Sequence, residues 1–128
     1  MAGRVLLVDE DPEVISTVQM LLSAHGYEVL AENTTAGALA TALVNQPDLV
    51  ILDIGIQGGQ GSNVIRRLRE QIRTVNIPII LLTAQASEND FRRAFAIGVA
   101  KYITKPFRPI ELLHAVDEII ERCRFEEA

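Results

Sequence analysis

Five short apolar runs alternate along the chain with segments whose apolar residues recur every three or four positions. The runs predict strands and read RVLLV (4–8), YEVL (27–30), DLVILD (48–53), IPIILLT (77–83) and KYIT (101–104). The other segments predict helices. Strands that are apolar on both faces are typical of a parallel sheet covered by helices on both sides.

Turn and cap residues mark the ends of the predicted helices. Asp11 is interpreted as the N-cap of the first helix, because Pro12 follows it in the first helical position. The later helices are expected from Thr34 or Thr35 to about Asn45, around Val64 to Ile72, from Ser87 to about Ile97, and from Pro109 onward. In the last helix one side is apolar and consists of Leu112, Leu113, Val116, Ile119, Ile120 and Cys123.

Five strand–helix pairs in this order predict one α/β domain over residues 1–128. Since parallel crossovers are right-handed, few topologies remain. The best match is a flavodoxin-like, doubly wound (βα)5 fold, a three-layer sandwich with strand order 2-1-3-4-5. In such sheets ligands bind beyond the carboxyl ends of the strands.

Composition narrows the class of protein. The net charge is −5 and the pI about 5.0, which argues against a dedicated nucleic-acid surface. A single cysteine, Cys123, cannot form an internal disulfide and fits a reducing compartment. No apolar run approaches the ~20 residues of a membrane span, and the start MAGRVLL does not resemble a signal peptide. We therefore expect a cytoplasmic domain that binds neither membrane nor nucleic acid directly.

The expected strand ends carry the candidate chemistry. Asp9 and Glu10 follow the first strand, Asp53 ends the third, Thr83 ends the fourth, and Lys105 follows the fifth. In the order 2-1-3-4-5 these side chains face one crevice. Three clustered carboxylates need a counter-charge, and a hard divalent cation supplies it. With no His or Cys close by in the sequence, Mg²⁺ is favoured, with Mn²⁺ as an alternative.

Four segments give this arrangement a family resemblance: LLVDED, PDLVILDIGIQGGQG, PIILLTA and YITKPF. They resemble, in order and spacing, the motifs of response-regulator receiver domains from two-component signalling, including chemotaxis-regulator-like receivers. The resemblance covers essentially the whole chain. It implies a phosphorylation-switched phosphoprotein whose only chemistry is self-directed phosphotransfer and autodephosphorylation, and which is therefore not an enzyme.

The resemblance also implies a role for each strand-end residue. Asp53 matches the phosphoacceptor, a carboxylate nucleophile. Asp9 and Glu10 match the acidic pair that holds Mg²⁺, together with Asp53 and the main-chain carbonyl of Gly55. Lys105 matches the lysine that pairs with the acceptor or its phosphate.

The signalling elements follow from the same resemblance. Thr83 matches the hydroxyl that engages a phosphoryl oxygen, and Tyr102 the aromatic residue that reorients on activation. The bond between Lys105 and Pro106 is expected to be cis. The implied partners are a sensor histidine kinase or a phosphotransfer protein, and a downstream protein. A phosphate-dependent homodimer is expected to use the fourth helix, fifth strand and fifth helix.

Two stretches depart from the family pattern. After Asp53 the turn reads Ile56, Gln57, Gly58, Gly59, Gln60, Gly61, where the family commonly carries a proline and Gly-x-[Asp/Asn]-Gly. We expect a looser turn here, because a proline is replaced and a glycine is gained. Gly55 and Gln85 occupy positions that tune the lifetime of the phosphate.

Two other functions fit part of the pattern. A haloacid-dehalogenase-like, Mg²⁺-dependent phosphohydrolase also uses a strand-end Asp nucleophile, but it needs a second Asp where this chain has Gly55. A flavodoxin-like cofactor binder would place a flavin phosphate near the acids, which repel it, and the phosphate loop after the first strand is missing.

Overall fold

The computed structural model describes residues 3–84, 92 and 96–127. Its strands are β1 (Arg4–Val8), β2 (Glu28–Glu32), β3 (Leu49–Asp53), β4 (Ile79–Thr83) and β5 (Lys101–Thr104). Its helices are α1 (Pro12–Ala24), α2 (Thr35–Asn45), α3 (Ile56–Gly59), α4 (Gly61–Arg69) and α6 (Pro109–Glu127). The segment predicted as a helix from Ser87 to Ile97 lies mostly outside the described residues.

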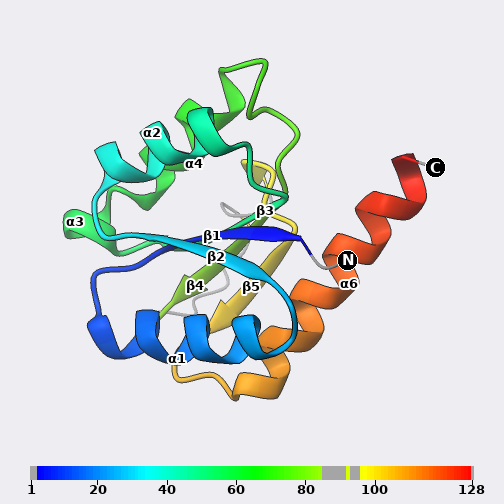
Figure 1. Cartoon of the computed structure of the whole chain (residues 1–128). Coiled ribbons are helices and arrows are strands. Elements are labelled where there is room, and N and C mark those ends of the chain that lie inside the picture. Colours follow the sequence, from blue (N-terminus) through cyan, green and yellow to red (C-terminus); the bar gives the residue numbers. More distant parts are fainter. Residues whose placement is uncertain (1–2, 85–91, 93–95, 128) are drawn as a thin grey trace.

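All described strand pairs are parallel, in the order β2-β1-β3-β4-β5. This confirms the predicted flavodoxin-like sheet. Figure 1 shows α1 and α6 on one face of the sheet and α2 and α4 on the other. The loops that follow β1 and β3 emerge at the same edge of the sheet. That edge is where the sequence predicts the site.

Apolar side chains alternate between two cores, one on each face of the sheet. Leu7 and Ile51 belong to the core beneath α1 and α6, whereas Leu6 and Leu52 belong to the core beneath α2 and α4. Each fully buried aliphatic side chain contributes about 1.5–3 kcal/mol relative to an exposed one. Both faces of the central strands are buried, so a shift of one strand along its neighbour would expose apolar side chains. The register of the strands is therefore fixed, and their carboxyl ends lie side by side.

Local capping sets the start of two helices as predicted. The Asp11 side chain accepts a hydrogen bond from the main-chain N–H of Glu13 at 2.9 Å, with Pro12 in the first turn of α1. Thr34 caps α2 in the same way, by accepting from Gly37 N–H at 3.0 Å. These bonds satisfy N–H groups that have no partner within the helix.

The helix predicted around Val64 to Ile72 is shorter than its apolar spacing suggests. It ends at Arg69, and Ile72 is 94% exposed instead of buried. A residue beyond the helix closes its last turn: the buried Thr74 hydroxyl donates a hydrogen bond to the Leu68 carbonyl at 2.6 Å. The Arg69 side chain extends beyond the end of the helix, and its guanidinium donates hydrogen bonds to the main-chain carbonyls of residues 75, 77 and 98. Burial lowers the pKa of Arg69, although the group stays a cation.

Candidate functional site

Four neighbouring strands, β1, β3, β4 and β5, bring the predicted site residues to one place. Val8 is paired with Leu52, so Asp9 and Asp53, the next residue on each strand, leave β1 and β3 at the same level. Asp53 is paired with Leu82, and Thr83 with Thr104 on β5. Parallel pairing therefore brings together residues that are up to 96 positions apart in sequence.

A lysine lies between the two central carboxylates. The Lys105 ammonium contacts Asp9 Oδ2 at 2.7 Å and Asp53 Oδ2 at 3.6 Å. Asp9 is 1% exposed, and its other oxygen, Oδ1, accepts the N–H of Asp11 at 2.9 Å. A buried carboxylate is costly unless it is paired and hydrogen-bonded, and Asp9 meets both conditions.

The main chain at Lys105 is also held in place. The Lys105 N–H donates to Thr83 O at 2.7 Å, and this hydrogen bond joins the end of β5 to the end of β4. The bond between Lys105 and Pro106 is cis, as expected from the resemblance. These features place the ammonium above the sheet edge.

Thr83 and Tyr102 lie on the same face of the sheet. Leu81 is paired with Tyr102, and residues two apart on a strand share a face, so Thr83 belongs to that face as well. Thr83 is buried, and Tyr102 packs against the core beneath α2 and α4. A movement of the Thr83 side chain can therefore change the position of the Tyr102 side chain.

The acids suit a hard cation chemically, although they are not yet gathered around one position. Carboxylates and a main-chain carbonyl are the donors that Mg²⁺ and Mn²⁺ prefer. The Glu10 side chain, however, is hydrogen-bonded to the turn after β3: its Oε1 accepts the N–H of Gln57 at 2.7 Å. Within the described ranges, no three His, Cys, Asp or Glu side chains are grouped closely enough to hold a metal. The donor set fits the cation, provided that Glu10 changes partner.

Comparison with known proteins decides the family. Residues 5–117 match the sequence profile described as the response regulator receiver domain. The chain belongs to that family. It is thus a receiver domain of two-component signalling, which favours the signalling reading over the phosphohydrolase and the flavin binder.

Individual relatives agree with the family assignment. The receiver is 36% identical over 123 residues to the phosphate regulon transcriptional regulatory protein PhoB of Pseudomonas aeruginosa, covering 95% of this chain and 54% of PhoB. The chain spans about half the length of the curated relatives it matches.

Solved structures show the same architecture. A CheY-like response regulator receiver domain protein of Methanospirillum hungatei superposes with a TM-score of 0.90 at 25% identity, covering 98% of this chain and 99% of that one. The BeF3-activated N-terminal receiver domain of Klebsiella pneumoniae RstA gives 0.83 at 31% identity, covering 91% and 97%.

The turn of this receiver after Asp53 is open in the middle and fixed at both ends. A side chain at Gly58 or Gly59 would meet no atom within 4 Å, and both have positive φ. At one end Ile56 is fully buried, and at the other an added Cβ on Gly61 would lie 2.5 Å from Ile54 Cα. Space for a side chain is therefore available at Gly58 and Gly59 but not at Gly61, and the looser turn stays a prediction.

Sequence reasoning missed the role of Gln57 in this turn. Gln57 takes a left-handed conformation with φ 48° and ψ 50°, so α3 is a kinked turn rather than a regular helix. Its side-chain Oε1 accepts the N–H of Thr35 at 2.6 Å, and its own N–H donates to Glu10. The adjacent glycines were the one local signal for a left-handed segment. The partners are 22 and 47 residues away and carry no local signal.

Of the two residues expected to tune the lifetime of the phosphate, the structure describes Gly55 alone. Gln85 lies outside the described residues. Gly55 donates its N–H to Asp53 Oδ1 at 3.1 Å, and its carbonyl accepts from Gly59 at 3.2 Å. A carbonyl oxygen has a second lone pair, so that bond does not prevent it from binding a cation. Among the described helices, none is long and apolar enough to cross a membrane.

Proposed function

We propose that Asp53 accepts a phosphoryl group from the phosphohistidine of a sensor histidine kinase or a phosphotransfer protein. The observation that carries this is the Lys105 ammonium between Asp9 and Asp53, at the meeting point of three parallel strands. In the transfer, a carboxylate oxygen of Asp53 forms a bond to phosphorus as the phosphorus–nitrogen bond of the donor breaks. In autodephosphorylation, water attacks phosphorus and releases inorganic phosphate. On this proposal the receiver domain occupies residues 1–128 and turns over no separate substrate.

The surrounding residues share the charge of the transferred group. Phosphoryl transfer depends on positioning and on neutralising the equatorial oxygens. Lys105 supplies one positive charge, and the Thr83 hydroxyl supplies a donor from the end of β4. A divalent cation, Mg²⁺ or Mn²⁺, would be held by Asp9, Glu10, Asp53 and the Gly55 carbonyl and would supply the remaining positive charge.

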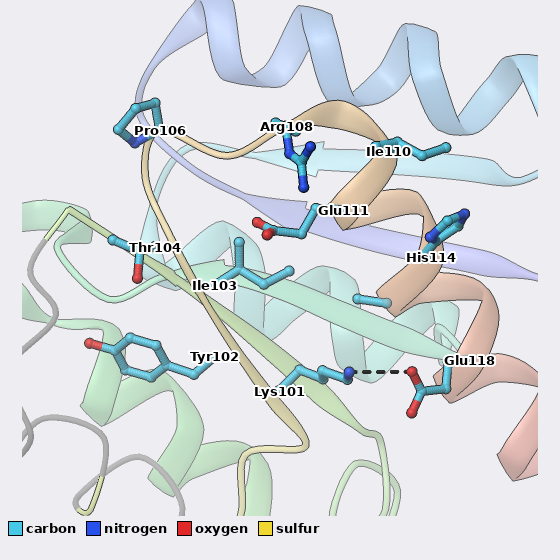
Figure 2. Close-up of a pocket in the computed structure, with 11 residues that line it drawn as sticks. Lys101, Tyr102, Ile103, Thr104, Pro106, Arg108, Ile110, Glu111, His114 and Glu118 are labelled. Carbon is cyan, nitrogen blue, oxygen red and sulfur yellow. Dashed lines mark ion pairs between the residues drawn. The ribbon is translucent and has the colours of Figure 1, made fainter.

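The surface of β5 and α6 is proposed to carry the signal. A pocket of about 710 Å³ lies there, and Figure 2 shows Arg108, Glu111 and His114 gathered along its α6 side. Lys101 and Glu118 form an exposed ion pair of 3.3 Å across it. Tyr102 points away from this charged group. Phosphorylation adds about −1.5 to −2 charges, which would draw Thr83 toward Asp53 and let Tyr102 turn inward.

This polar surface suits a weak contact. We propose a phosphate-dependent homodimer or the docking of a downstream protein there, without direct nucleic-acid or membrane binding. The BeF3-activated RstA receiver is a relative crystallised in an activated form, which supports the use of beryllofluoride as a probe.

Labelling tests the acceptor. Acetyl phosphate with Mg²⁺ should add one phosphate to the wild-type chain, detected by mass spectrometry. Asp53→Asn should abolish the addition, because the nucleophile is gone. Asp11→Asn is the matched control: Asn caps a helix about as well as Asp, and labelling should persist. Equal labelling of Asp53→Asn would refute the assignment.

Fluorescence tests the switch. The chain has two tyrosines and no tryptophan, so Tyr27→Phe leaves Tyr102 as the single emitter. Beryllofluoride should change its emission, and sedimentation should show association. Unchanged emission in a protein labelled at Asp53 would place the signal on another surface.

A further inference from the structure

Gln57 links the loop after β1 to the first turn of α2. Its main-chain N–H donates to Glu10 Oε1 at 2.7 Å, on the loop after β1. Its side-chain Oε1 accepts from Thr35 N–H at 2.6 Å, in the first turn of α2. One residue of the β3–α4 turn thus holds a predicted metal ligand and a helix terminus at the same time.

The backbone of Gln57 indicates that this link is not incidental. Its φ of 48° lies in the left-handed region, which glycine enters freely and residues with a Cβ enter at a cost. Strain of this kind persists only where the surroundings maintain it, and it marks candidate functional positions. Here the maintaining contacts are the two hydrogen bonds to Glu10 and Thr35.

The position of Glu10 gives the link a consequence. Its carboxylate is bonded to the turn rather than grouped with Asp9 and Asp53, and the described residues hold no assembled trio of ligands. Joining a cation at the strand ends therefore requires the Glu10 carboxylate to move from this position toward Asp9 and Asp53. The α2 terminus shares that dependence, because Thr34 satisfies Gly37 N–H while Gln57 satisfies Thr35 N–H.

We propose that Gln57 is a positioning residue that holds Glu10 away from the cation site, and that its bond to Thr35 makes the release of Glu10 depend on the N-terminus of α2. The proposal rests on the proposed function, in which Glu10 is a cation ligand. The apparent affinity for the cation is lowered by the fraction of molecules in the held state. By linkage, cation binding frees the first turn of α2, so the occupancy of the site is reported on that surface.

A change at the Gln57 side chain tests this. Gln57→Met keeps the length of the side chain and the left-handed strain but removes the acceptor for Thr35. Mg²⁺ should bind about threefold more tightly, as expected for the loss of one modest hydrogen bond from the held state. Calorimetric titration of the whole chain with MgCl2 measures this. Without metal, amide exchange at Thr35 should be faster in the variant than in wild type.

Two controls make the result specific. Gln60→Met places the same substitution three residues away, where the side chain accepts a hydrogen bond from Asn63, and should leave Mg²⁺ affinity unchanged. In a Glu10→Ala background, Gln57→Met should have no effect on Mg²⁺ affinity, because no ligand remains to be held. Gln57→Asn, which tolerates the left-handed backbone but is one methylene too short for Thr35, should behave like Gln57→Met.

The outcomes separate this proposal from the function on which it rests. If Asp53 accepts phosphate from acetyl phosphate but Gln57→Met binds Mg²⁺ no more tightly than wild type, the holding role is wrong. The same conclusion follows if the effect of Gln57→Met survives in Glu10→Ala. If wild type takes up no phosphate at all, the proposed function fails, whatever the titrations give.

Discussion

The turn after β1 and the turn after β3 both begin at an acid of the site, yet they are built in opposite ways. After β1, Asp9 is buried and paired, and Asp11 and Pro12 begin α1 within two residues. After β3, seven residues separate Asp53 from Gly61, the first residue of α4. That stretch has three left-handed residues, Gln57, Gly58 and Gly59, and α4 begins without a side-chain cap. The first turn combines a local cap at Asp11 with the pairing of Asp9 and Lys105, whereas Gln57 in the second turn is held by distant residues.

This difference teaches where the site is rigid and where it can change. The first turn holds Asp9 with two hydrogen bonds and a lysine, so its carboxylate has little freedom. The second turn is closely packed at Ile56 and Gly61, and between them Gln57 is held by single hydrogen bonds to Glu10 and Thr35. The first turn thus carries the fixed carboxylate of Asp9, whereas Gln57 of the second turn sets the position of the neighbouring Glu10.

Substitution of Gly61 should break the second turn most severely. A Cβ there would lie 2.5 Å from Ile54 Cα and 2.7 Å from Ile54 O, both main-chain atoms that cannot rotate away. We expect Gly61→Ala to lower the free energy of unfolding by about 2–3 kcal/mol, as overpacking does. Urea unfolding measures it.

Gly58→Ala is the matched control for Gly61→Ala. The space at Gly58 is open, so only the positive φ is penalised, by about 1 kcal/mol. Equal losses at the two glycines would show that backbone conformation, rather than the approach of Ile54, sets the cost.

Removal of the lysine should test the rigidity of the first turn. Lys105→Met leaves the Asp9 carboxylate buried without its cation, and Lys105 itself is 20% exposed. The expected loss in the absence of Mg²⁺ is about 2 kcal/mol, less than for a fully buried pair. Thermal unfolding measures it, and added Mg²⁺ should restore part of the stability.

A double variant sharpens that test. Asp9→Asn in the Lys105→Met background removes the unpaired charge and should recover part of the loss. If the double variant is as unstable as the sum of the single variants, Asp9 and Lys105 do not stabilise each other.

Loss of the local cap should have the smallest effect of the three. Asp11→Ala removes the acceptor for Glu13 N–H and should cost about 1 kcal/mol. Thr34→Ala at α2 is the comparison, and should cost a similar amount unless the bond from Thr35 to Gln57 compensates. Denaturant unfolding of both variants, with and without Gln57→Met, distinguishes these cases.

The sequence predicts those structural features that are set by residues close together in the chain. Apolar periodicity located the described strands and the starts of α1, α2 and α6, because burial and capping act within a few positions. The grouping of Asp9, Asp53 and Lys105 was predicted from the strand order, since parallel strands end at one edge. The sequence and the topology rule therefore account for most of the described sheet and for the centre of the site.

The rest depends on contacts between distant segments. The helix around Val64 was predicted to reach Ile72, but it ends at Arg69, whose guanidinium donates to the carbonyl of Gly98, 29 residues away. The diversion of Glu10 to Gln57 has no signature in either segment alone. Such bonds need the coordinates of both partners, which spacing along one segment does not provide.

The ion pair between Asp9 and Lys105 also has a consequence during synthesis. The two residues are 96 positions apart, and at synthesis rates of ~5–20 residues per second the lysine emerges roughly 5–20 s after the aspartate. Until then a growing chain carries an acid destined for the interior without its counter-charge. The centre of the receiver therefore cannot close on the ribosome before the fifth strand has been made, and a prematurely terminated chain keeps its acids open to water.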